Sequence, residues 1–322
     1  MPQFGRKFTL LRLVIAASLL AYTFWRSNPR EVWQIAAGAT VSPLVVAVSL
    51  VLLDRALMAW RWFVLLRPLE PGTLPPFGAI LRIFFVSTFL GTFLPGSIGG
   101  DAVRAYSLSR HEVSAGDAVA SVFLDRMLGV LSLLLMTMLG LVLARDLSAS
   151  LGVRLALLVT TLACVTTALL IFSDRAELRA AQGLRALPWQ RARRLAEDIV
   201  ASMRRYSSYR RDLAAVLGAS VGVQILRVVQ AYYLGVSLGL HQPIGVYFAF
   251  VPLILLVMLL PITVNGIGTS QAAFVWLFGR VGTPDSSSFA LSVLFVALGI
   301  VGNLPGAFLY VSESREVPGE AG

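Results

Sequence analysis

The chain has 322 residues, of which 57% are hydrophobic and 14% are charged, and its mean hydropathy is +0.78. These values exclude an ordinary soluble domain. They predict an all-α polytopic integral membrane protein, because several apolar runs reach the ~20 residues with which a helix crosses a bilayer. The formal net charge of +10 lies in short loops between apolar runs and not on one folded basic face. We therefore expect this charge to orient the chain in the membrane, and we predict no nucleic-acid partner.

The cysteine and histidine content predicts no metal site. Cys164 is the single cysteine and lies in an apolar run, and His111 and His241 are far apart in the sequence. A disulfide framework or a His/Cys metal site needs several such residues at suitable spacing. The chain also has no GxxxxGK[ST] motif and no paired histidines, so we predict no cofactor and no catalytic residue.

Six apolar runs are predicted to cross the membrane as complete helices. In chain order they are residues 13–25, 41–66, 118–144, 155–172, 213–240 and 289–310. Arg6 and Lys7 precede the first run, and no small-residue cleavage site follows it. We therefore expect a retained first helix, with the N-terminus of the chain on the cytoplasmic side of the plasma membrane.

The most basic part of the chain is the loop 173–212. Its ten arginines outnumber its five acidic residues, so the positive-inside rule predicts a cytoplasmic loop. Apolar residues from Ala192 to Leu213 recur at steps of three, four or seven, with arginines between them. This period predicts an amphipathic helix on the inner leaflet or against the helix bundle.

Placing the N-terminus and the basic loop on the same side constrains the segment 77–108. The numbers of crossings on either side of it require this segment to begin and end on one side of the membrane. It could contain two complete spans, or it could be a re-entrant hairpin with a broken tip at residues 95–100. Its length of ~30 residues barely allows two spans, so we predict the hairpin.

The tip motif FLPGSIGGDAVR, residues 93–104, combines helix-breaking and ionisable residues at the end of an apolar run. Pro95, Gly99 and Gly100 open the backbone, and inside a bilayer an open backbone must be satisfied by protein or by a water-filled cavity. Asp101 and Arg104 lie three residues apart and would share a helix face. The motif is thus a candidate functional site. The alternative is an ordinary loop in which Asp101 caps a helix and Arg104 is solvated.

A second broken segment, LPITVNGIGTSQ at residues 260–271, resembles the first. A shift of 166 residues places Pro95 on Pro261 and Arg61 on Arg227. The stretch between the copies crosses the membrane an odd number of times, so we expect the second hairpin to enter from the opposite side. Inverted repeats with paired broken helices indicate the central site of a transporter. The predicted organisation is therefore a first repeat over 1–172, the basic loop 173–212, a second repeat over 213–311 and a short tail over 312–322.

The span 41–66 contains three charged residues. Asp54 and Arg55 are adjacent and point about 100° apart on a helix, so we expect them not to face each other, whereas Arg61 shares the face of Asp54. Charges in a span either face the bundle interior or reach an interface. Arg61 stands between Trp60 and Trp62, which favours an interface anchor.

Three motifs in order carry a resemblance to a known family: residues 93–104, the pair Asp125 and Arg126 followed by Gly129, and PITVNGIG at residues 261–268. Together they resemble the flippase-like integral membrane family that includes the membrane region of lysylphosphatidylglycerol synthase, over roughly residues 11–310. The resemblance implies a transporter that moves a lipid or a lipid-linked headgroup between leaflets. The site residues that it implies are Pro95, Gly99, Gly100, Asp101, Arg104, Asp125, Arg126, Asn265, Gly266 and Gly268.

The sequence departs from the family pattern in two places. After Gly268 the family often has Arg-Glu, whereas Ser270 and Gln271 stand here, so a role for that carboxylate, such as proton coupling, is not carried over. Few residues follow Tyr310, so we do not expect the soluble aminoacyl-transfer domain of the family in this chain.

Three classes of function fit these observations. The first is a translocator whose broken hairpins shelter the headgroup of an anionic or phosphate-bearing lipid. Arg61, Arg104, Arg126 and Arg227 are candidates to bind the phosphate, because a guanidinium offers two parallel donors. The second is a membrane glycosyl- or phosphotransferase acting on a lipid carrier, with Asp101 or Asp125 as base or metal ligand. The third is a scaffold for envelope-biosynthesis partners.

Overall fold

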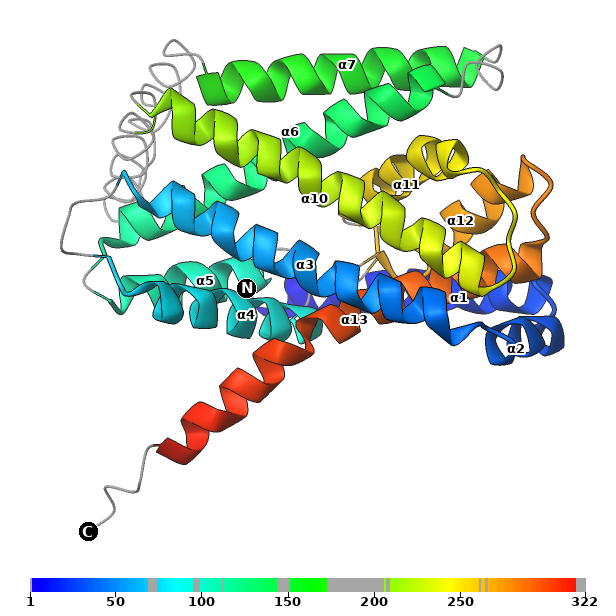
Figure 1. Cartoon of the computed structure of the whole chain (residues 1–322), viewed down its shortest axis with the longest axis horizontal. Helices are drawn as coiled ribbons and strands as arrows, with labels where there is room; N and C mark the ends of the chain where they lie inside the picture. Colours follow the sequence, from blue (N-terminus) through cyan, green and yellow to red (C-terminus); the bar gives the residue numbers. More distant parts are fainter. Residues whose placement is uncertain are drawn as a thin grey trace.

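The computed structural model describes residues 2–68, 74–94, 99–111, 113–143, 151–172, 206, 209–260, 262–263 and 266–316. Within these ranges the chain forms eleven helices and no strand, which confirms the all-α prediction (Figure 1). The helices are α1 (Pro2–Arg26), α2 (Pro29–Ala37), α3 (Val41–Leu66), α4 (Phe77–Phe93), α5 (Gly99–Ser109), α6 (Ala115–Leu143), α7 (Leu151–Phe172), α10 (Arg210–Ser237), α11 (Ile244–Leu259), α12 (Thr269–Gly279) and α13 (Asp285–Glu316).

Four of the described helices, α3, α6, α10 and α13, are long and apolar enough to cross a membrane. The protein is therefore a multi-pass integral membrane protein. The other two predicted spans lie in α1 and α7, which are 25 and 22 residues long and include the shorter apolar segments Leu13–Arg26 and Leu158–Thr167. The amphipathic helix predicted in the basic loop falls outside the described residues, apart from Tyr206, which is buried against Leu213.

Helices α4 and α5 form the first predicted hairpin. They have 17 and 11 residues and measure about 26 and 17 Å, which is less than the ~30 Å of a hydrocarbon core, so neither crosses alone. Ile80 near the start of α4 is buried in one cluster with Leu108 near the end of α5. Gly78 and His111, at the two ends of the segment, line the same surface cavity. The segment therefore begins and ends on one side, as the parity of the spans predicts.

Two glycines allow the hairpin to close at its tip. A Cβ atom on Gly100 would lie 2.9 Å from the carbonyl oxygen of Ser87, and one on Gly91 would lie 2.9 Å from the Cα atom of Gly100. Because glycine has no Cβ, the backbones of α4 and α5 can touch here. A residue larger than glycine at either position would therefore push α4 and α5 apart.

Helices α11 and α12 form the second hairpin. They have 16 and 11 residues, so each is again shorter than a span. The rings of Tyr247 at the start of α11 and Phe278 at the end of α12 pack edge to face, with centroids 5.2 Å apart. Gln242 before the hairpin donates a hydrogen bond from Nε2 to the carbonyl oxygen of Val281 after it, at 3.1 Å. This hairpin also begins and ends on one side.

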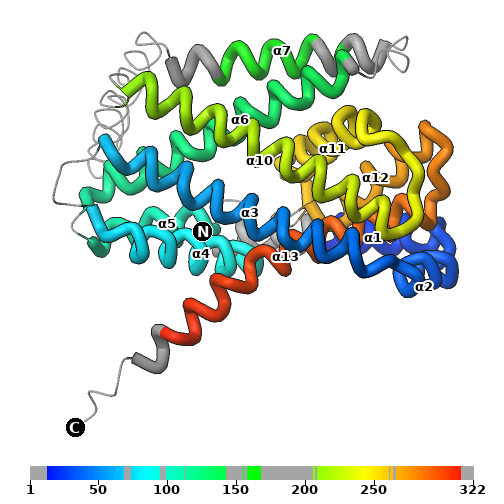
Figure 2. The backbone as a smooth tube through the Cα atoms, viewed as in Figure 1, coloured from blue at the N-terminus to red at the C-terminus, as the bar shows by residue number. Residues whose placement is uncertain are grey.

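The two hairpins belong to an inverted repeat. Helix α3 leads into the first hairpin and α10 into the second, and the Thr40 N–H before α3 donates to the carbonyl oxygen of Ser237 at the end of α10, at 2.8 Å. The two helices therefore lie antiparallel, so their hairpins start at opposite ends. Figure 2 shows α3 and α10 side by side through the centre of the molecule, with α4 and α5 toward one end and α11 and α12 toward the other.

Helix packing follows the same pseudo-two-fold relation. Helix α13 packs on α4, and its equivalent α6 packs on α11, the equivalent of α4. Each contact is closed by a glycine, and these glycines, Gly140 and Gly306, are 166 residues apart. A Cβ atom on Gly140 would lie 2.5 Å from the carbonyl oxygen of Phe248. A Cβ atom on Gly306 would overlap the carbonyl oxygen of Phe85. At this offset the helices α3, α4, α5 and α6 thus correspond to α10, α11, α12 and α13.

Candidate functional site

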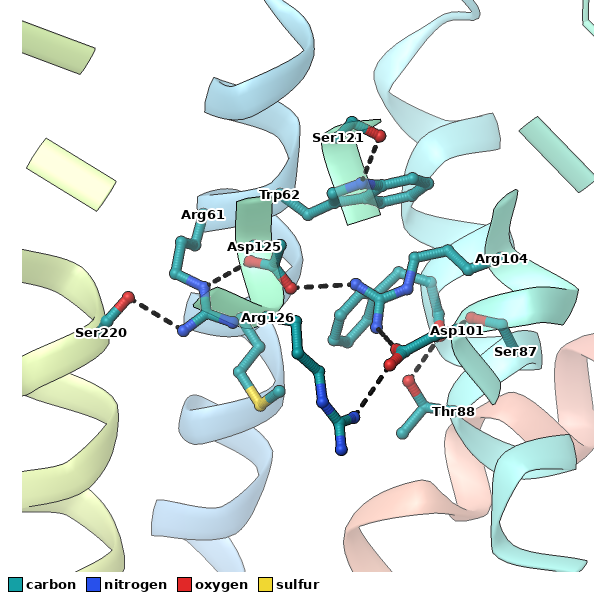
Figure 3. A network of polar contacts seen from close by, with 12 residues as sticks. Arg61, Trp62, Ser87, Thr88, Asp101, Arg104, Ser121, Asp125, Arg126 and Ser220 are labelled. Atoms are coloured by element: carbon teal, nitrogen blue, oxygen red, sulfur yellow. Dashed lines mark hydrogen bonds and ion pairs between the residues drawn. The ribbon is translucent and has the colours of Figure 1, made fainter. Parts of the chain in front are cut away.

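Five charged side chains from α3, α5 and α6 form a chain of alternating sign, which we call the hairpin cluster: Arg61, Asp125, Arg104, Asp101 and Arg126 (Figure 3). Arg61 Nε donates to Asp125 Oδ1 at 2.7 Å, and Arg104 Nη1 donates to Asp125 Oδ2 at 3.1 Å. Arg104 Nη2 donates to Asp101 Oδ1 at 3.0 Å, and Arg126 Nη1 donates to Asp101 Oδ2 at 2.8 Å. Each aspartate therefore bridges two arginines.

The inner end of the hairpin cluster is removed from solvent. Asp125 and Arg61 are 3% and 4% exposed, and buried charges are stable only when they are paired and hydrogen-bonded. Arg61 Nη1 also donates to the hydroxyl of Ser220 on α10 at 2.9 Å. The guanidinium of Arg104 lies over the rings of Trp62 and Phe84, at 5.3 and 5.1 Å from their centroids, where cation–π attraction adds to the ion pairs.

The structure corrects two sequence-based interpretations of these residues. The interface-anchor interpretation of Arg61 is wrong, because Arg61 and the neighbouring Trp62 are buried between helices and only Trp60 is exposed. The capping alternative for Asp101 is also wrong. Helix α5 begins at Gly99, and both carboxylate oxygens of Asp101 bind arginines.

A second group of charges, which we call the α3–α10 cluster, consists of Asp54, Arg55 and Arg227. Arg55 Nη1 donates to Asp54 Oδ2 at 2.6 Å, and Arg227 Nε donates to Asp54 Oδ1 at 3.3 Å. We expected Asp54 and Arg55 not to face each other, and this is wrong. The long arginine side chain bends across the helix surface, whereas our argument considered only the directions of the Cα–Cβ bonds. Arg55 Nε also donates to Asn303 Oδ1 at 2.9 Å, and Asn303 Nδ2 donates to Thr92 Oγ1 at 2.8 Å.

Both clusters face one cavity of about 360 Å³. Its polar lining includes Asp101 and Arg104 of the hairpin cluster and all three residues of the α3–α10 cluster. Helices α3, α4, α5, α10, α11 and α13 contribute to its walls, so it lies between the two repeats. The cavity places hydroxyl, amide and guanidinium groups inside a bundle whose outer surface is apolar.

The structure brings some of the predicted site residues together and separates others. Arg61, Asp101, Arg104, Asp125 and Arg126 meet in the hairpin cluster, while Gly100 and Arg227 line the cavity beside it. Gly99 packs where its Cβ atom would lie 2.5 Å from the Cβ atom of Leu94. Pro95 and Asn265 lie outside the described residues.

Gly266 and Gly268 shape the start of α12 and are not among the described residues that line the cavity. Their φ angles of 73° and 88° are in the region that favours glycine. A Cβ atom on Gly268 would also lie 2.6 Å from the carbonyl oxygen of Ala16 on α1. Gln271 stands where the resemblance would place a carboxylate. Its Oε1 accepts a hydrogen bond from the Gly268 N–H at 2.6 Å, which gives a partner to one of the backbone N–H groups left free at the start of α12.

The sequence analysis did not select Asp54, Arg55, Asn303, Thr92 or Ser220 as site residues. The repeat offset of 166 residues offers a signal for Ser220. It places Asp54 on Ser220 and Arg61 on Arg227, because 54 + 166 = 220 and 61 + 166 = 227. The contact of Arg227 with Asp54 is therefore the repeat equivalent of the contact of Arg61 with Ser220. Thr92 and Asn303 stand singly in apolar runs, where no spacing distinguishes them.

Comparisons with known proteins agree with this architecture. Residues 9–306 match the family described as the lysylphosphatidylglycerol synthase TM region. The chain is also similar to a protein named UPF0104 membrane protein from Methanothermobacter thermautotrophicus. The two are 24% identical over 277 residues, which cover 79% of this chain and 78% of that protein.

Proposed function

Because this chain belongs to the lysylphosphatidylglycerol synthase transmembrane-region family, we propose that it moves the headgroup of an anionic, phosphate-bearing lipid between leaflets. The observation that carries this proposal is the cavity between the two repeats, with arginines of both clusters on its walls. A lipid headgroup crossing the hydrocarbon core needs such a polar enclosure, since an unsatisfied polar group in hydrocarbon costs several kcal/mol.

The charge of the two clusters favours an anionic ligand. Five arginines (Arg55, Arg61, Arg104, Arg126 and Arg227) and three aspartates (Asp54, Asp101 and Asp125) give a net charge of 5 − 3 = +2. A guanidinium binds a phosphate through two parallel hydrogen bonds. A phosphate headgroup in the cavity would therefore find guanidinium donors on both walls, those of Arg104 and Arg227.

The hairpin cluster offers a way to bind and release such a headgroup. The side chain of Asp101 is 18% exposed, whereas that of Asp125 is 5% exposed and fixed between Arg61 and Arg104. A phosphate that enters the cavity can compete with Asp101 for the outer donor of Arg104, while Asp101 keeps its contact with Arg126. The exchange of one anion for another keeps Arg104 paired throughout, which lowers the cost of loading and unloading.

The inverted repeat supports a mechanism in which access alternates between the two sides. The hairpins enter from opposite ends, and in transporters of this design movement of one repeat against the other exposes a central site to each side in turn. We further propose that the N-terminus and the loop 173–212 are cytoplasmic, that the membrane is the plasma membrane, and that the lipid serves envelope biosynthesis. The chain would move the lipid without a catalytic step.

A reconstitution experiment tests this function. The purified protein is placed in vesicles with fluorescent phosphatidylglycerol, and dithionite is added outside to bleach the label in the outer leaflet. We expect vesicles with the protein to lose more fluorescence than protein-free vesicles, because label from the inner leaflet reaches the outer one.

Arg104→Gln should slow this movement by about tenfold or more, since hydrogen bonds to charged groups contribute ~1.5–3 kcal/mol. In this variant Asp125 keeps Arg61 and Asp101 keeps Arg126, so every carboxylate retains a partner. The matched control is Arg280→Gln, because Arg280 stacks on Trp276 at the end of α12 and does not line the cavity. Chemical conversion of the lipid without transbilayer movement would instead favour a transferase.

A further inference from the structure

We infer that the central cavity selects a lipid whose headgroup joins a phosphate to a hydroxyl-bearing group, such as a glycerol or a sugar. This inference rests on the proposed function and narrows its substrate class. The cavity walls supply hydrogen-bond donors for phosphate oxygens and, beside them, neutral acceptors that need a donor from the ligand. A hydroxyl group provides such a donor, whereas an ionised phosphodiester only accepts.

Gln230 on α10 is the neutral acceptor on one wall. It lines the cavity, although the residue is only 3% exposed. Its Nε2 atom donates to the carbonyl oxygen of Leu50 at 3.2 Å, and no described residue donates a hydrogen bond to its Oε1 atom. The lone pairs of this amide oxygen are therefore left for a group inside the cavity.

Arg227 stands three residues before Gln230 on α10, about 4.5 Å along the helix axis, and both residues line the cavity. The side chain of Arg227 is 25% exposed, and it donates from Nε to Asp54 and from Nη2 to the sulfur of Met58. A phosphate bound to Arg227 therefore places its attached glycerol or sugar beside Gln230. This wall thus presents a donor for a phosphate and an acceptor for a hydroxyl in adjacent turns of one helix.

The opposite wall repeats this combination with Arg104 on α5 and Thr88 on α4, which both line the cavity. The hydroxyl of Thr88 donates to the carbonyl oxygen of Phe84 at 2.7 Å, so its oxygen can still accept a hydrogen bond. Arg104 donates from Nη2 to Asp101, and this is the contact for which an entering phosphate competes. A headgroup between the two walls thus meets a guanidinium and a neutral acceptor on each of them.

An ammonium headgroup fits this arrangement less well, although it also donates hydrogen bonds. At Gln230 an ammonium would lie one helical turn from the guanidinium of Arg227, and like charges at this spacing repel each other. The carboxylates among the described lining residues, Asp54 and Asp101, already accept from arginines through both oxygens. Phe295 is the one aromatic side chain in the described lining, whereas quaternary ammonium groups are bound by cages of several.

The size of the cavity agrees with such a headgroup. Ligand pockets in proteins measure roughly 300–1,000 Å³, and this one lies at the lower end of that range. Its apolar wall contains Leu255, Met258 and Phe295, beside which the first methylene groups of acyl or prenyl chains can lie. The cavity thus suits a compact phosphate-linked polyol whose lipid chains remain in the bilayer.

Binding titrations on the purified full chain in uncharged detergent test the inference with two lipids of equal charge. Phosphatidylglycerol has two hydroxyls in its headgroup, and phosphatidylpropanol has the same headgroup carbon skeleton without them. We expect phosphatidylglycerol to bind about tenfold more tightly, which is the effect of one or two additional hydrogen bonds. Equal affinity of the parent protein for the two lipids would overturn the inference, and this result does not depend on how any variant folds.

Two further lipids identify the hydroxyl-bearing group. Phosphatidylinositol presents a sugar-like ring, so whichever of phosphatidylinositol and phosphatidylglycerol binds more tightly shows whether the cavity suits a ring or a glycerol. Phosphatidylethanolamine should bind no more tightly than phosphatidylpropanol. Tighter binding of phosphatidylethanolamine than of phosphatidylglycerol would overturn the inference.

Gln230→Met keeps the length of the side chain and removes the amide oxygen. It should reduce the preference for phosphatidylglycerol over phosphatidylpropanol to about threefold or less, through weaker binding of phosphatidylglycerol. The matched control is Gln242→Met, because Gln242 also donates from Nε2 to a backbone carbonyl, that of Val281, but does not line the cavity. This control should keep the tenfold preference. An equal loss of affinity for both lipids in Gln230→Met would overturn the inference.

The failure of the inference and the failure of the proposed function are distinguishable. A protein that prefers phosphatidylglycerol to phosphatidylpropanol but moves neither across reconstituted vesicles retains the inferred selectivity and loses the transport function. A protein that moves both lipids and binds them equally retains the transport function and loses the inference.

Discussion

Asp125 is the residue on which the hairpin cluster depends most, and Asp125→Asn is the substitution that tests this. The carboxylate accepts hydrogen bonds from Arg61 at 2.7 Å and Arg104 at 3.1 Å, and it is almost fully buried. The amide keeps the shape of the side chain but removes the charge, so two buried guanidinium groups lose a shared counter-ion. Removing one partner of a buried ion pair costs about 3–5 kcal/mol, so we expect a loss of that size in the free energy of unfolding.

The geometry also predicts how the free energy of unfolding should rank among the variants. Arg61→Gln removes one arginine but leaves Asp125 paired with Arg104, so it should destabilise the protein less than Asp125→Asn does. The double variant should be less destabilised than the sum of the two single ones, because the residues are in direct contact. Asp285→Asn serves as the control, since Asp285 and Arg26 form a surface pair 3.3 Å apart and exposed ion pairs contribute little to stability.

The assay is reversible unfolding in mixed micelles, followed by circular dichroism, for the parent and the four variants. A loss for Asp125→Asn no larger than that for Arg61→Gln would refute the view that one carboxylate holds two arginines. If Asp125→Asn lowered the free energy of unfolding by less than about 1 kcal/mol, the range measured for surface ion pairs, the hairpin cluster would be solvated and not buried.

Two further predictions concern the fold. Gly268→Ala should lower the melting temperature, because the left-handed conformation costs a non-glycine residue about 1–2 kcal/mol and the new methyl group would press on the backbone of α1. Gly299→Ala is the control, because a Cβ atom on Gly299 would have no neighbour within 4 Å. Equal melting temperatures for the two variants would contradict this prediction. In a Cys164→Ala background, Gly78→Cys and Gly245→Cys should react with an impermeant thiol reagent from opposite sides of the membrane, because they stand at the starts of the two hairpins. Reaction of both from the same side would contradict the inverted repeat.

The helices and the repeat were largely predictable because they depend on properties that a sequence displays directly. The length of an apolar run sets a span, and proline and glycine mark where it breaks. Helix α3 matches its predicted range, residues 41–66, for this reason. Helix α2 was not predicted, because its nine residues are too short and too polar to form a span, and the prediction was based on the length of apolar runs.

The charged residues were also predictable, but their partners were not. Helix geometry gives the direction in which a side chain leaves the backbone, whereas the partner of an arginine depends on where its flexible chain can reach. For this reason Arg55 pairs with its neighbour Asp54, and Arg61 pairs with Asp125, 64 residues away. Burial of Arg61 depends on how α6 and α10 pack around α3, which no pattern within 41–66 contains.

A cryo-electron-microscopy map of the protein in nanodiscs that contain an anionic phospholipid would show directly whether a headgroup occupies the cavity. We predict density for a phosphate headgroup inside the cavity, between Arg104 and Arg227, with the acyl chains leaving toward the bilayer. Headgroups found only on the outer surface, with the cavity closed by neighbouring side chains, would contradict it.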